Sequence, residues 1–355
     1  MTHPQTTAPV LVTGASGYIA SWVIQKLLTQ GYTVHATVRD LNKSKSFAHL
    51  EKIADSTPGT LKLFQANLLS PGSFDQAMQG CEIVFHMASP FVVTNYKDAV
   101  KDIIEPAVLG TENVLNSVNQ TESVKRVIVT SSIASTYGDA IDILQTENNS
   151  FDESHWNTTS SATHQPYPYS KVMAERKAWE MAEAQDRWDL VCINPALVFG
   201  QSLTPNTQSG SVEVLQQFAN GMTLLGVPPM WNGVVDVQDV AEAHIRAAFN
   251  PQAHGRYIIC SESLSLLEMG QILRAYFGNK FPFPRNQLPK AAFKMFGPVA
   301  GFSRKFVALN MGYPIFFNAQ KSKNELGTEY RPVKESLVEH FQQLLDDGVV
   351  KKYIP

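Results

Sequence analysis

The chain has 355 residues, 44% of them apolar and 17% charged, with a formal net charge of −3 at pH 7. At ~150 residues per domain, this length predicts one large domain or two smaller ones. No apolar run approaches the ~18 residues of a membrane span, and the charge lacks the basic excess of nucleic-acid-binding proteins. We therefore expect neither a membrane nor a nucleic acid as partner. The three cysteines form no CxxC pair, which argues against a disulfide framework. The opening residues, MTHPQTTAP, lack the order of a signal peptide, so we expect a cytoplasmic protein.

Apolar, β-branched runs alternate with helical patterns along the first part of the chain. The runs that predict strands are Val10–Thr13, Thr33–Val38, Leu61–Gln65, Ile83–His86, Val127–Ser131 and Leu190–Asn194. Helical spacing follows between them at Tyr18–Gln30, Ser44–Ala54, Pro71–Met78, Val100–Val118 and Ser170–Ala184. Repeated strand–helix units predict an α/β fold with a doubly wound parallel sheet. The continuous apolar strands suit burial on both faces.

A glycine-rich turn joins the first strand to the first helix. The residues VTGASGYIA place Gly14, Gly17 and Ala20 at this turn. Small residues there permit a tight turn, close approach of backbone to a pyrophosphate and close packing of helix on strand. The N–H groups of Ser16 to Ile19 would then point at the phosphates. Small residues also occur at ordinary βα turns, but the strand–turn–helix context favours a dinucleotide site.

The end of the second strand indicates which dinucleotide binds. Arg39 and Asp40 stand there, and Lys43 follows. At this place an acidic residue suits the ribose 2′-hydroxyl of NAD, whereas Arg suits the 2′-phosphate of NADP. Arg39 and Lys43 therefore predict NADP(H). Asp40 leaves open a bond to the ribose hydroxyls, and solvated charges at a helix start remain the alternative for the two cations.

Candidate catalytic groups follow the fifth strand and open the fifth helix. Tyr167 and Lys171 form a Tyr-x-x-x-Lys sequence. On a helix this spacing puts both side chains on one face, where the ammonium lowers the phenol pKa from ~10 toward neutrality and favours a general acid. Ser132 ends the fifth strand, at the edge of a parallel sheet where ligands bind, and can hold a substrate carbonyl. Ser131 is the competing choice, but alternation along the strand turns it the other way.

The same Tyr-x-x-x-Lys spacing occurs twice more in the chain. These further pairs are Tyr276 with Lys280, and Tyr330 with Lys334. A Gly-Asn sequence interrupts the first pair and a Pro the second, so neither is expected to lie on one continuous helical turn. We interpret both as chance occurrences.

The pattern changes after about residue 200. Residues 201–232 are rich in Gly, Pro, Asn and Thr, and the segment 262–355 has the pattern of short helices with proline-rich joints. We expect residues 1–200 to form an NADP-binding Rossmann domain, to which residues 234–250 return. Residues 201–233 and 251–355 are expected to form a smaller, mostly helical C-terminal substrate lobe.

Taken in order, the motifs TGASGYIA, VRD, FHMASP, GTENVL, VTSS, YPYSK and NPALVFG resemble those of the extended short-chain dehydrogenases/reductases. With the FDESHW stretch at residues 151–156, the chain is similar to the dihydroflavonol reductase and yeast methylglyoxal reductase branch of aldehyde and ketone reductases. The resemblance covers residues 8–350. It implies an NADPH-dependent carbonyl reductase whose catalytic groups are Ser132, Tyr167 and Lys171, with Tyr167 the proton donor. An epimerase, a hydroxysteroid dehydrogenase/isomerase and a non-catalytic NADP-sensing regulator are the alternatives.

The resemblance also implies the residues that contact the cofactor. Arg39 and Lys43 would clamp the 2′-phosphate, and Lys171 would hold the nicotinamide ribose. Asn67 departs from the family, which commonly has an Asp there to accept from the adenine amine. The full expected set is Gly14, Ser16, Gly17, Tyr18, Ile19, Arg39, Lys43, Asn67, Leu68, Met87, Ala88, Ser89, Thr130, Tyr167, Lys171, Pro195, Ala196, Leu197 and Val198.

The substrate is expected to be a small carbonyl compound in an apolar pocket, which favours hydrophobic ketones and aldehydes. The expected lining residues are Phe91, Val93, Ser132, Ile133, Tyr167, Phe199, Leu225, Val227 and Met230. The nine His residues show no metal-ligand spacing, so no metal site is expected. A monomer and a homodimer both fit the sequence.

Overall fold

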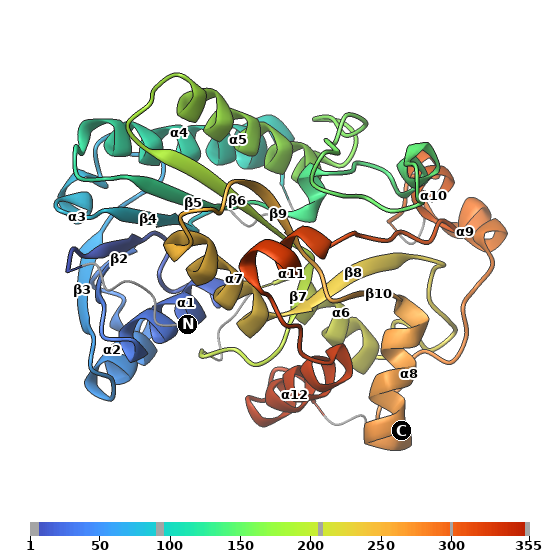
Figure 1. Ribbon diagram of the computed structural model, residues 1–355. Helices are drawn as coiled ribbons and strands as arrows, with labels where there is room; N and C mark the ends of the chain where they lie inside the picture. Colours follow the sequence, from blue (N-terminus) through green and yellow to red (C-terminus); the bar gives the residue numbers. More distant parts are fainter. Residues whose placement is uncertain (1–6, 90–95, 205–208, 299–300, 352–355) are drawn as a thin grey trace.

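The computed structural model describes residues 7–89, 96–204, 209–298 and 301–351. Its centre is a parallel sheet with the strand order β3-β2-β1-β4-β5-β6-β9 (Figure 1). The strands are β1 (Val10–Val12), β2 (Thr33–Val38), β3 (Thr60–Gln65), β4 (Ile83–His86), β5 (Arg126–Thr130), β6 (Asp189–Pro195) and β9 (Gly255–Ile259). The order reverses beside β1, which opens a crevice for a ligand at the carboxyl ends of β1 and β4. The predicted doubly wound fold is confirmed.

Helices cover both faces of this sheet (Figure 1). On one face α1 (Tyr18–Thr29) packs against α7 (Val237–Phe249), and on the other α4 (Glu105–Gln120) packs against α5 (Pro166–Glu183). Successive β1 residues point to opposite faces, so Val10 and Val12 join the core under α1 and α7. Leu11 joins the core under α4 and α5. Burial on both faces explains why the strands are continuously apolar.

Four helices begin or end differently from the sequence prediction. The most consequential is α5, which begins at Pro166 instead of Ser170 and so includes Tyr167. Proline suits the first helical turn because its missing N–H has no partner there in any case. The segment 44–54 divides at Phe47 into η1 (Ser44–Ser46) and α2 (Ala48–Asp55). In 71–78 only α3 (Asp75–Met78) is helical, and a π-helical turn, η2 (Val100–Ile104), precedes α4.

The later part of the chain adds a small sheet and short helices. The sheet has the order β10-β8-β7, with β7 (Leu197–Phe199), β8 (Trp231–Asp236) and β10 (Glu262–Ser265). Around it lie α6 (Gly210–Ala219), α8 (Leu266–Phe277), α9 (Lys290–Phe296), α10 (Arg304–Asn310), α11 (Gln320–Leu326) and α12 (Val333–Asp346). A core rich in phenylalanine joins α8 and α12 through Phe277, Phe281, Phe283 and Phe341.

The sequence-based boundary between the two parts is wrong at β9. Residues 251–355 were expected in the smaller lobe, but β9 pairs with β6 and is the edge strand of the large sheet. The local sequence of β9 does not reveal that it pairs with a distant parallel strand and is covered by helices. Of the segment 234–250, α7 packs on α1, whereas β8 belongs to the small sheet.

All three cysteines, Cys81, Cys192 and Cys260, are buried and unpaired. Burial raises the pKa of the Cys81 and Cys260 thiols to about 12, so neither is a reactive thiolate at neutral pH. Within the described ranges, no helix is both long and apolar enough to cross a membrane.

Candidate active site

The candidate site lies where four strands of the large sheet end. Gly14 follows β1, Ala88 follows β4, Ser132 follows β5, and Pro195 ends β6. In a parallel sheet these carboxyl ends share one edge, so residues far apart in sequence meet there. The structure thus brings together the glycine turn, the candidate catalytic serine and the segment expected beside the nicotinamide.

The glycine turn has the shape that a dinucleotide needs. Gly14 has a φ of +67°, and a Cβ on it would come 2.8 Å from the Ala88 Cα, so the two strand ends touch through backbone. Gly17 is the N-cap of α1 and donates its N–H to the Gly14 carbonyl at 2.9 Å. The N–H groups of the first turn of α1 have no partner within the helix and suit a pyrophosphate. These backbone features fit the predicted dinucleotide.

Replacing Gly14 with Ala is expected to destabilise the fold more than replacing Gly31. Both glycines have positive φ, +67° and +86°, but a Cβ at Gly31 meets nothing within 4 Å. Gly31→Ala should therefore cost only the left-handed backbone strain of roughly 1–2 kcal/mol. Gly14→Ala adds the clash with Ala88. Urea unfolding of both variants measures the difference, and equal losses would contradict the close contact.

A threonine that the sequence analysis missed holds the loop after β4. Thr13 Oγ1 accepts the N–H groups of Met87 and Ala88, each at 3.0 Å, and lies 3.1 Å from His86 Nδ1. Burial lowers the pKa of His86 to about 4, so this imidazole is neutral. Thr13 therefore orients the backbone of the loop on which Ser89 lies. The sequence feature that could have indicated this role is a polar residue, Thr13, directly after a buried strand.

Tyr167 and Lys171 lie on one helix, as the spacing predicts. Both are partly buried on α5, with Lys171 Nζ 5.6 Å from the centre of the Tyr167 ring. The ammonium also donates to Ser89 Oγ at 2.9 Å. The pair is thereby joined to the loop after β4, at the edge where the glycine turn lies.

Ser132 is oriented to donate a hydrogen bond. It is the N-cap of η3 (Ile133–Ser135), a 3₁₀ turn that packs against α5, and its Oγ accepts the Ala134 N–H at 3.1 Å. Because that bond occupies the oxygen as an acceptor, the hydroxyl proton is free to point elsewhere. Ser131 is buried and hydrogen-bonds to Glu175 instead. Ser131 and Ser132 thus make different contacts, in line with the alternation of side chains along a strand.

The pKa values of the pair differ from the sequence expectation. Burial raises the pKa of the Tyr167 phenol to about 12 and lowers that of the Lys171 ammonium to about 8. Desolvation by burial is the cause of both pKa shifts, and it outweighs the stabilising effect of a neighbouring charge. Tyr167 is thus a neutral phenol at pH 7 and holds a proton that it can donate.

The other two Tyr-x-x-x-Lys pairs do not form such a site. Tyr276 lies in the last turn of α8, which ends at Phe277, and Gly278, with a φ of +68°, separates it from Lys280. Tyr330 precedes the start of α12 at Val333, while Lys334 lies inside that helix. The expectation that both are chance occurrences is confirmed by these breaks.

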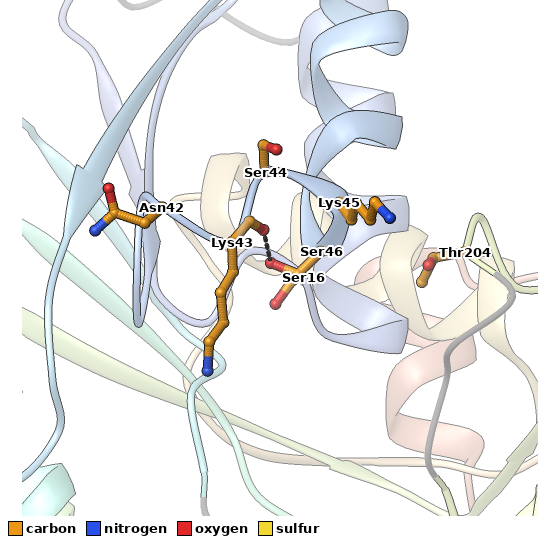
Figure 2. Close-up of a pocket in the computed structure, with 7 residues that line it drawn as sticks. All are labelled: Ser16, Asn42, Lys43, Ser44, Lys45, Ser46 and Thr204. Carbon is orange, nitrogen blue, oxygen red and sulfur yellow. Dashed lines mark hydrogen bonds between the residues drawn. The ribbon is translucent and has the colours of Figure 1, made fainter.

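A basic pocket adjoins the glycine turn, where the 2′-phosphate was expected. It has a volume of about 550 Å³, and its lining residues are Ser16, Asn42, Lys43, Ser44, Lys45, Ser46 and Thr204 (Figure 2). Figure 2 shows the Lys43 and Lys45 ammonium groups extending in different directions from η1. Among the described residues, no carboxylate forms an ion pair with either lysine. Two cations and several hydroxyls in one hollow suit a phosphate group.

Asp40 and Arg39 take different places beside this pocket. The Asp40 carboxylate accepts from the Asn42 backbone N–H at 3.0 Å and from the Asn42 amide at 3.2 Å. It therefore shapes the turn that carries Lys43. Arg39 is exposed and is not among the residues that line the pocket. Lys45, Ser44 and Ser46 were missed by the sequence analysis, although an extra lysine two residues after Lys43 was a visible signal.

Several other expected cofactor contacts have their side chains engaged elsewhere. The Tyr18 phenol donates to the Gly200 carbonyl at 2.5 Å, so only its backbone N–H faces the turn. Thr130 Oγ1 lies 2.7 Å from His244 Nε2. Asn67 Oδ1 accepts the Leu69 N–H at 3.1 Å, which leaves one lone pair for an adenine amine. The Leu68 carbonyl accepts a hydrogen bond from the Asn113 side chain. Residues 195–198 run from the end of β6 into β7.

The cavity found near the candidate catalytic residues differs from the expected apolar pocket. A cavity of about 150 Å³ lies beside η3 and the start of α5, and its lining residues are Ala134, Tyr137, Gly138, Ala140, Gln165, Pro168, Met230, Trp231, Asn232, Phe306, Asn310 and Ile315. Polar and apolar side chains share this lining. The residues from α10 and the segment after it were missed, because helices near the end of the chain give no local signal of facing this edge.

Of the expected pocket residues, Met230 lines this cavity, but six other described ones do not, namely Ser132, Ile133, Tyr167, Phe199, Leu225 and Val227. Phe199 and Val227 are completely buried in the core of the smaller part. Ile133 belongs to the core of the large sheet, and Leu225 is 83% exposed to solvent. Their apolar character reflects packing or a surface loop. Phe91 and Val93 lie outside the described residues. Across the described ranges, no three His, Cys, Asp or Glu side chains gather as a metal site.

Known proteins resemble this chain over nearly its whole length. The sequence profile of the NAD dependent epimerase/dehydratase family matches residues 10–260. Cinnamoyl-CoA reductase CAD2 of Medicago truncatula is 38% identical over 338 residues, 94% of this chain and 95% of the relative. Anthocyanidin reductase of Arabidopsis thaliana is 38% identical over 276 residues, 74% of this chain and 78% of the relative.

Solved structures give the same assignment. Gre2 from Candida albicans, crystallised with NADPH, superposes with a TM-score of 0.75 at 26% identity, over 96% of this chain and 99% of that one. The relatives are reductases, so this chain is an oxidoreductase that acts on carbonyl groups. It belongs to the NAD dependent epimerase/dehydratase family and is a reductase of the extended short-chain dehydrogenase/reductase type.

Proposed function

We propose that the protein is an NADPH-dependent reductase of aldehydes and hydrophobic ketones, with Tyr167 as the proton donor. The observation that carries this proposal is the grouping of Tyr167, Lys171 and Ser89 beside the glycine turn. Lys171 Nζ lies 5.6 Å from the Tyr167 ring centre and donates to Ser89 at 2.9 Å. Ser132, with its hydroxyl proton free to donate, stands on the turn packed against the same helix.

Each of these groups has a distinct role in the proposed reaction. NADPH, when bound, supplies the hydride. Ser132 donates a hydrogen bond to the substrate carbonyl oxygen, and Tyr167 transfers its proton to that oxygen as negative charge develops. Lys171 then stabilises the phenolate that remains on Tyr167, because its ammonium lies over the same ring. The products of one turnover are the alcohol and NADP⁺.

The basic pocket supports NADPH over NADH. Lys43, Lys45 and the hydroxyls of Ser16, Ser44 and Ser46 would hold the 2′-phosphate. An NAD enzyme would present a carboxylate to the ribose here, and Asn42 engages the Asp40 carboxylate through Oδ1 alone, so the support for NADPH comes from the lysines and hydroxyls of the pocket. Cation and hydroxyl donors therefore replace the acceptor that NAD requires.

The pH dependence of kcat/KM should report Lys171. Its pKa is lowered to about 8, and the ammonium is the form present below that value. As pH rises through 8 the charge that stabilises the Tyr167 phenolate is lost, so kcat/KM for reduction should fall roughly tenfold per pH unit. Tyr167, with a pKa of about 12, stays protonated throughout. Rates from pH 6 to 10 test this, and Lys171→Arg should move the descending limb to higher pH.

An absorbance assay separates the proposed reaction from other reactions in the family. The purified protein, NADPH and a panel of aldehydes and ketones should show loss of the reduced nicotinamide band only when a carbonyl compound is present. An epimerase would keep its dinucleotide bound and consume no added NADPH. Absence of NADPH consumption with every carbonyl in the panel would contradict the proposed function.

A further inference from the structure

A buried ion pair lies behind the candidate site, between α5 and β9. The Glu175 carboxylate accepts from Arg256 Nε at 2.6 Å, and the two side chains are 0% and 7% exposed. Taking two charges out of water is costly, so such a pair is retained only where further hydrogen bonds satisfy it. Neither residue was singled out by the sequence, since Glu175 four residues after Lys171 resembles an ordinary surface pair on a helix.

The second carboxylate oxygen of Glu175 reaches the turn that carries Ser132. It accepts hydrogen bonds from Ser131 Oγ, from Ser135 Oγ at 2.5 Å and from Asn194 Nδ2 at 2.9 Å. Asn194 Nδ2 has a second N–H and donates it to the Ser132 carbonyl at 3.2 Å, and Ser135 Oγ lies 2.7 Å from the same carbonyl, to which its single proton is the alternative donor. The backbone of Ser132 is thus fixed on both sides by groups that Glu175 orients.

Arg256 anchors the other end of this network. Its guanidinium donates to Ser135 Oγ at 3.0 Å and to the carbonyls of Glu153 and His155 at 2.9 and 2.6 Å. The Arg256 Cζ atom lies 4.0 Å from the centre of the Trp156 ring, so one face of the guanidinium covers that ring. A planar guanidinium with a counter-ion, carbonyl acceptors and an aromatic face is held in a single orientation.

We propose that Glu175, oriented by Arg256, is a positioning residue that fixes Ser132 relative to Tyr167. Glu175 stands on α5 four residues after Lys171 and eight after Tyr167, so these three side chains share one stripe of the helix. The same helix therefore carries the proton donor and, through Glu175, holds the turn of the carbonyl-binding serine. This inference rests on the proposed roles of Ser132 and Tyr167.

A double-mutant cycle tests whether Glu175 acts through Ser132. Glu175→Gln should lower kcat by roughly 10- to 100-fold, since a displacement of ~1 Å in a catalytic group can cost that much. NADPH affinity, measured by quenching of protein fluorescence, should stay within about twofold, because the network does not border the phosphate pocket. In the Ser132→Ala background the same substitution should lower kcat by less than about threefold.

The outcomes separate the inference from the proposed function. An equal loss of kcat from Glu175→Gln in both backgrounds would show that Glu175 acts independently of Ser132, which overturns the inference alone. If Ser132→Ala by itself keeps the wild-type kcat, the proposed role of Ser132 fails, and the positioning role fails with it. Non-additive losses with unchanged NADPH affinity support both.

A second pair of variants keeps the test decisive if Glu175→Gln does not fold. Arg256→Lys retains the buried positive charge but loses the fixed fork of donors. Arg126→Lys is its matched control, since Arg126 also forms an ion pair, with Asp189, and donates to three carbonyls, at the opposite end of β5. We expect Arg256→Lys to lower kcat at least fivefold. Arg126→Lys should leave kcat unchanged, and the two variants are compared at a similar loss of the free energy of unfolding. Equal kcat values in the two variants would overturn the inference.

Discussion

Replacing Tyr167 with Phe is expected to lower kcat by about 10²- to 10⁴-fold, the range that general acid catalysis contributes. Phe keeps the ring under Lys171 Nζ and removes only the hydroxyl, so the packing of α5 should not change. The phenol is protonated at pH 7 because burial raises the pKa of Tyr167 to about 12. Steady-state rates with NADPH and a turned-over carbonyl compound measure the loss.

NADPH binding supplies the control for that experiment. The phosphate pocket lies at η1 and the glycine turn, and Tyr167 is not among its lining residues. Tyr167→Phe should therefore bind NADPH with an affinity within about twofold of the wild type. Tyr169→Phe, two residues further along α5, is a matched substitution that should retain turnover. Substantial turnover by Tyr167→Phe would show that another group donates the proton.

Removing the lysines of the phosphate pocket is expected to have the second largest effect. Each charge-assisted bond to the 2′-phosphate contributes about 1.5–3 kcal/mol, so Lys43→Ala and Lys45→Ala should each weaken NADPH binding roughly 10- to 100-fold. The loss in the double variant should exceed either single loss but fall short of their product, because both lysines line one pocket and residues that share a site are rarely additive. NADH lacks that phosphate, so its affinity should change little. Titration calorimetry with both dinucleotides measures the ratio.

Lys52→Ala is the matched control for these variants. Lys52 is exposed on α2, close in sequence to η1, but is not among the residues that line the pocket. It removes the same charge without removing a contact, so both affinities should stay near the wild-type values. Equal weakening of NADPH and NADH by the pocket variants would show that the lysines attract the whole dinucleotide. The parallel variant Arg39→Ala tests the cation that the sequence singled out and that lies outside the pocket lining.

The parts of the site that follow local rules were predictable from sequence. The glycine turn, the strand end at Ser132 and the Tyr167–Lys171 pair each depend on a spacing of a few residues. Strand and helix periodicity fix such spacings before any tertiary contact forms. The structure keeps the glycine turn tight at Gly14 and puts Tyr167 and Lys171 on α5.

The lining of the cavity beside η3 was not predictable in the same way. An apolar residue buries itself wherever a complementary surface exists, and the sequence does not say whether that surface is a pocket or a core. Phe199 and Val227 accordingly pack in the core, while Leu225 remains in solvent. Phe306 and Asn310 reach the cavity from α10, far along the chain. The place of β9 in the large sheet was unpredictable for a similar reason, because its parallel partner β6 lies far from it in the sequence.

By itself, the sequence determined the doubly wound fold, the glycine turn and the placement of Tyr167 and Lys171 on one helix, because 3.6- and 2-residue periodicities and short motifs encode them locally. Only the tertiary structure decided which residues face one another across the site. It placed Lys45 with Lys43 in the lining of the basic pocket, joined Lys171 to Ser89, and buried Glu175 with Arg256 behind Ser132. Those choices depend on long-range packing, where the cost of burying a charge is met only by partners that folding brings from distant segments.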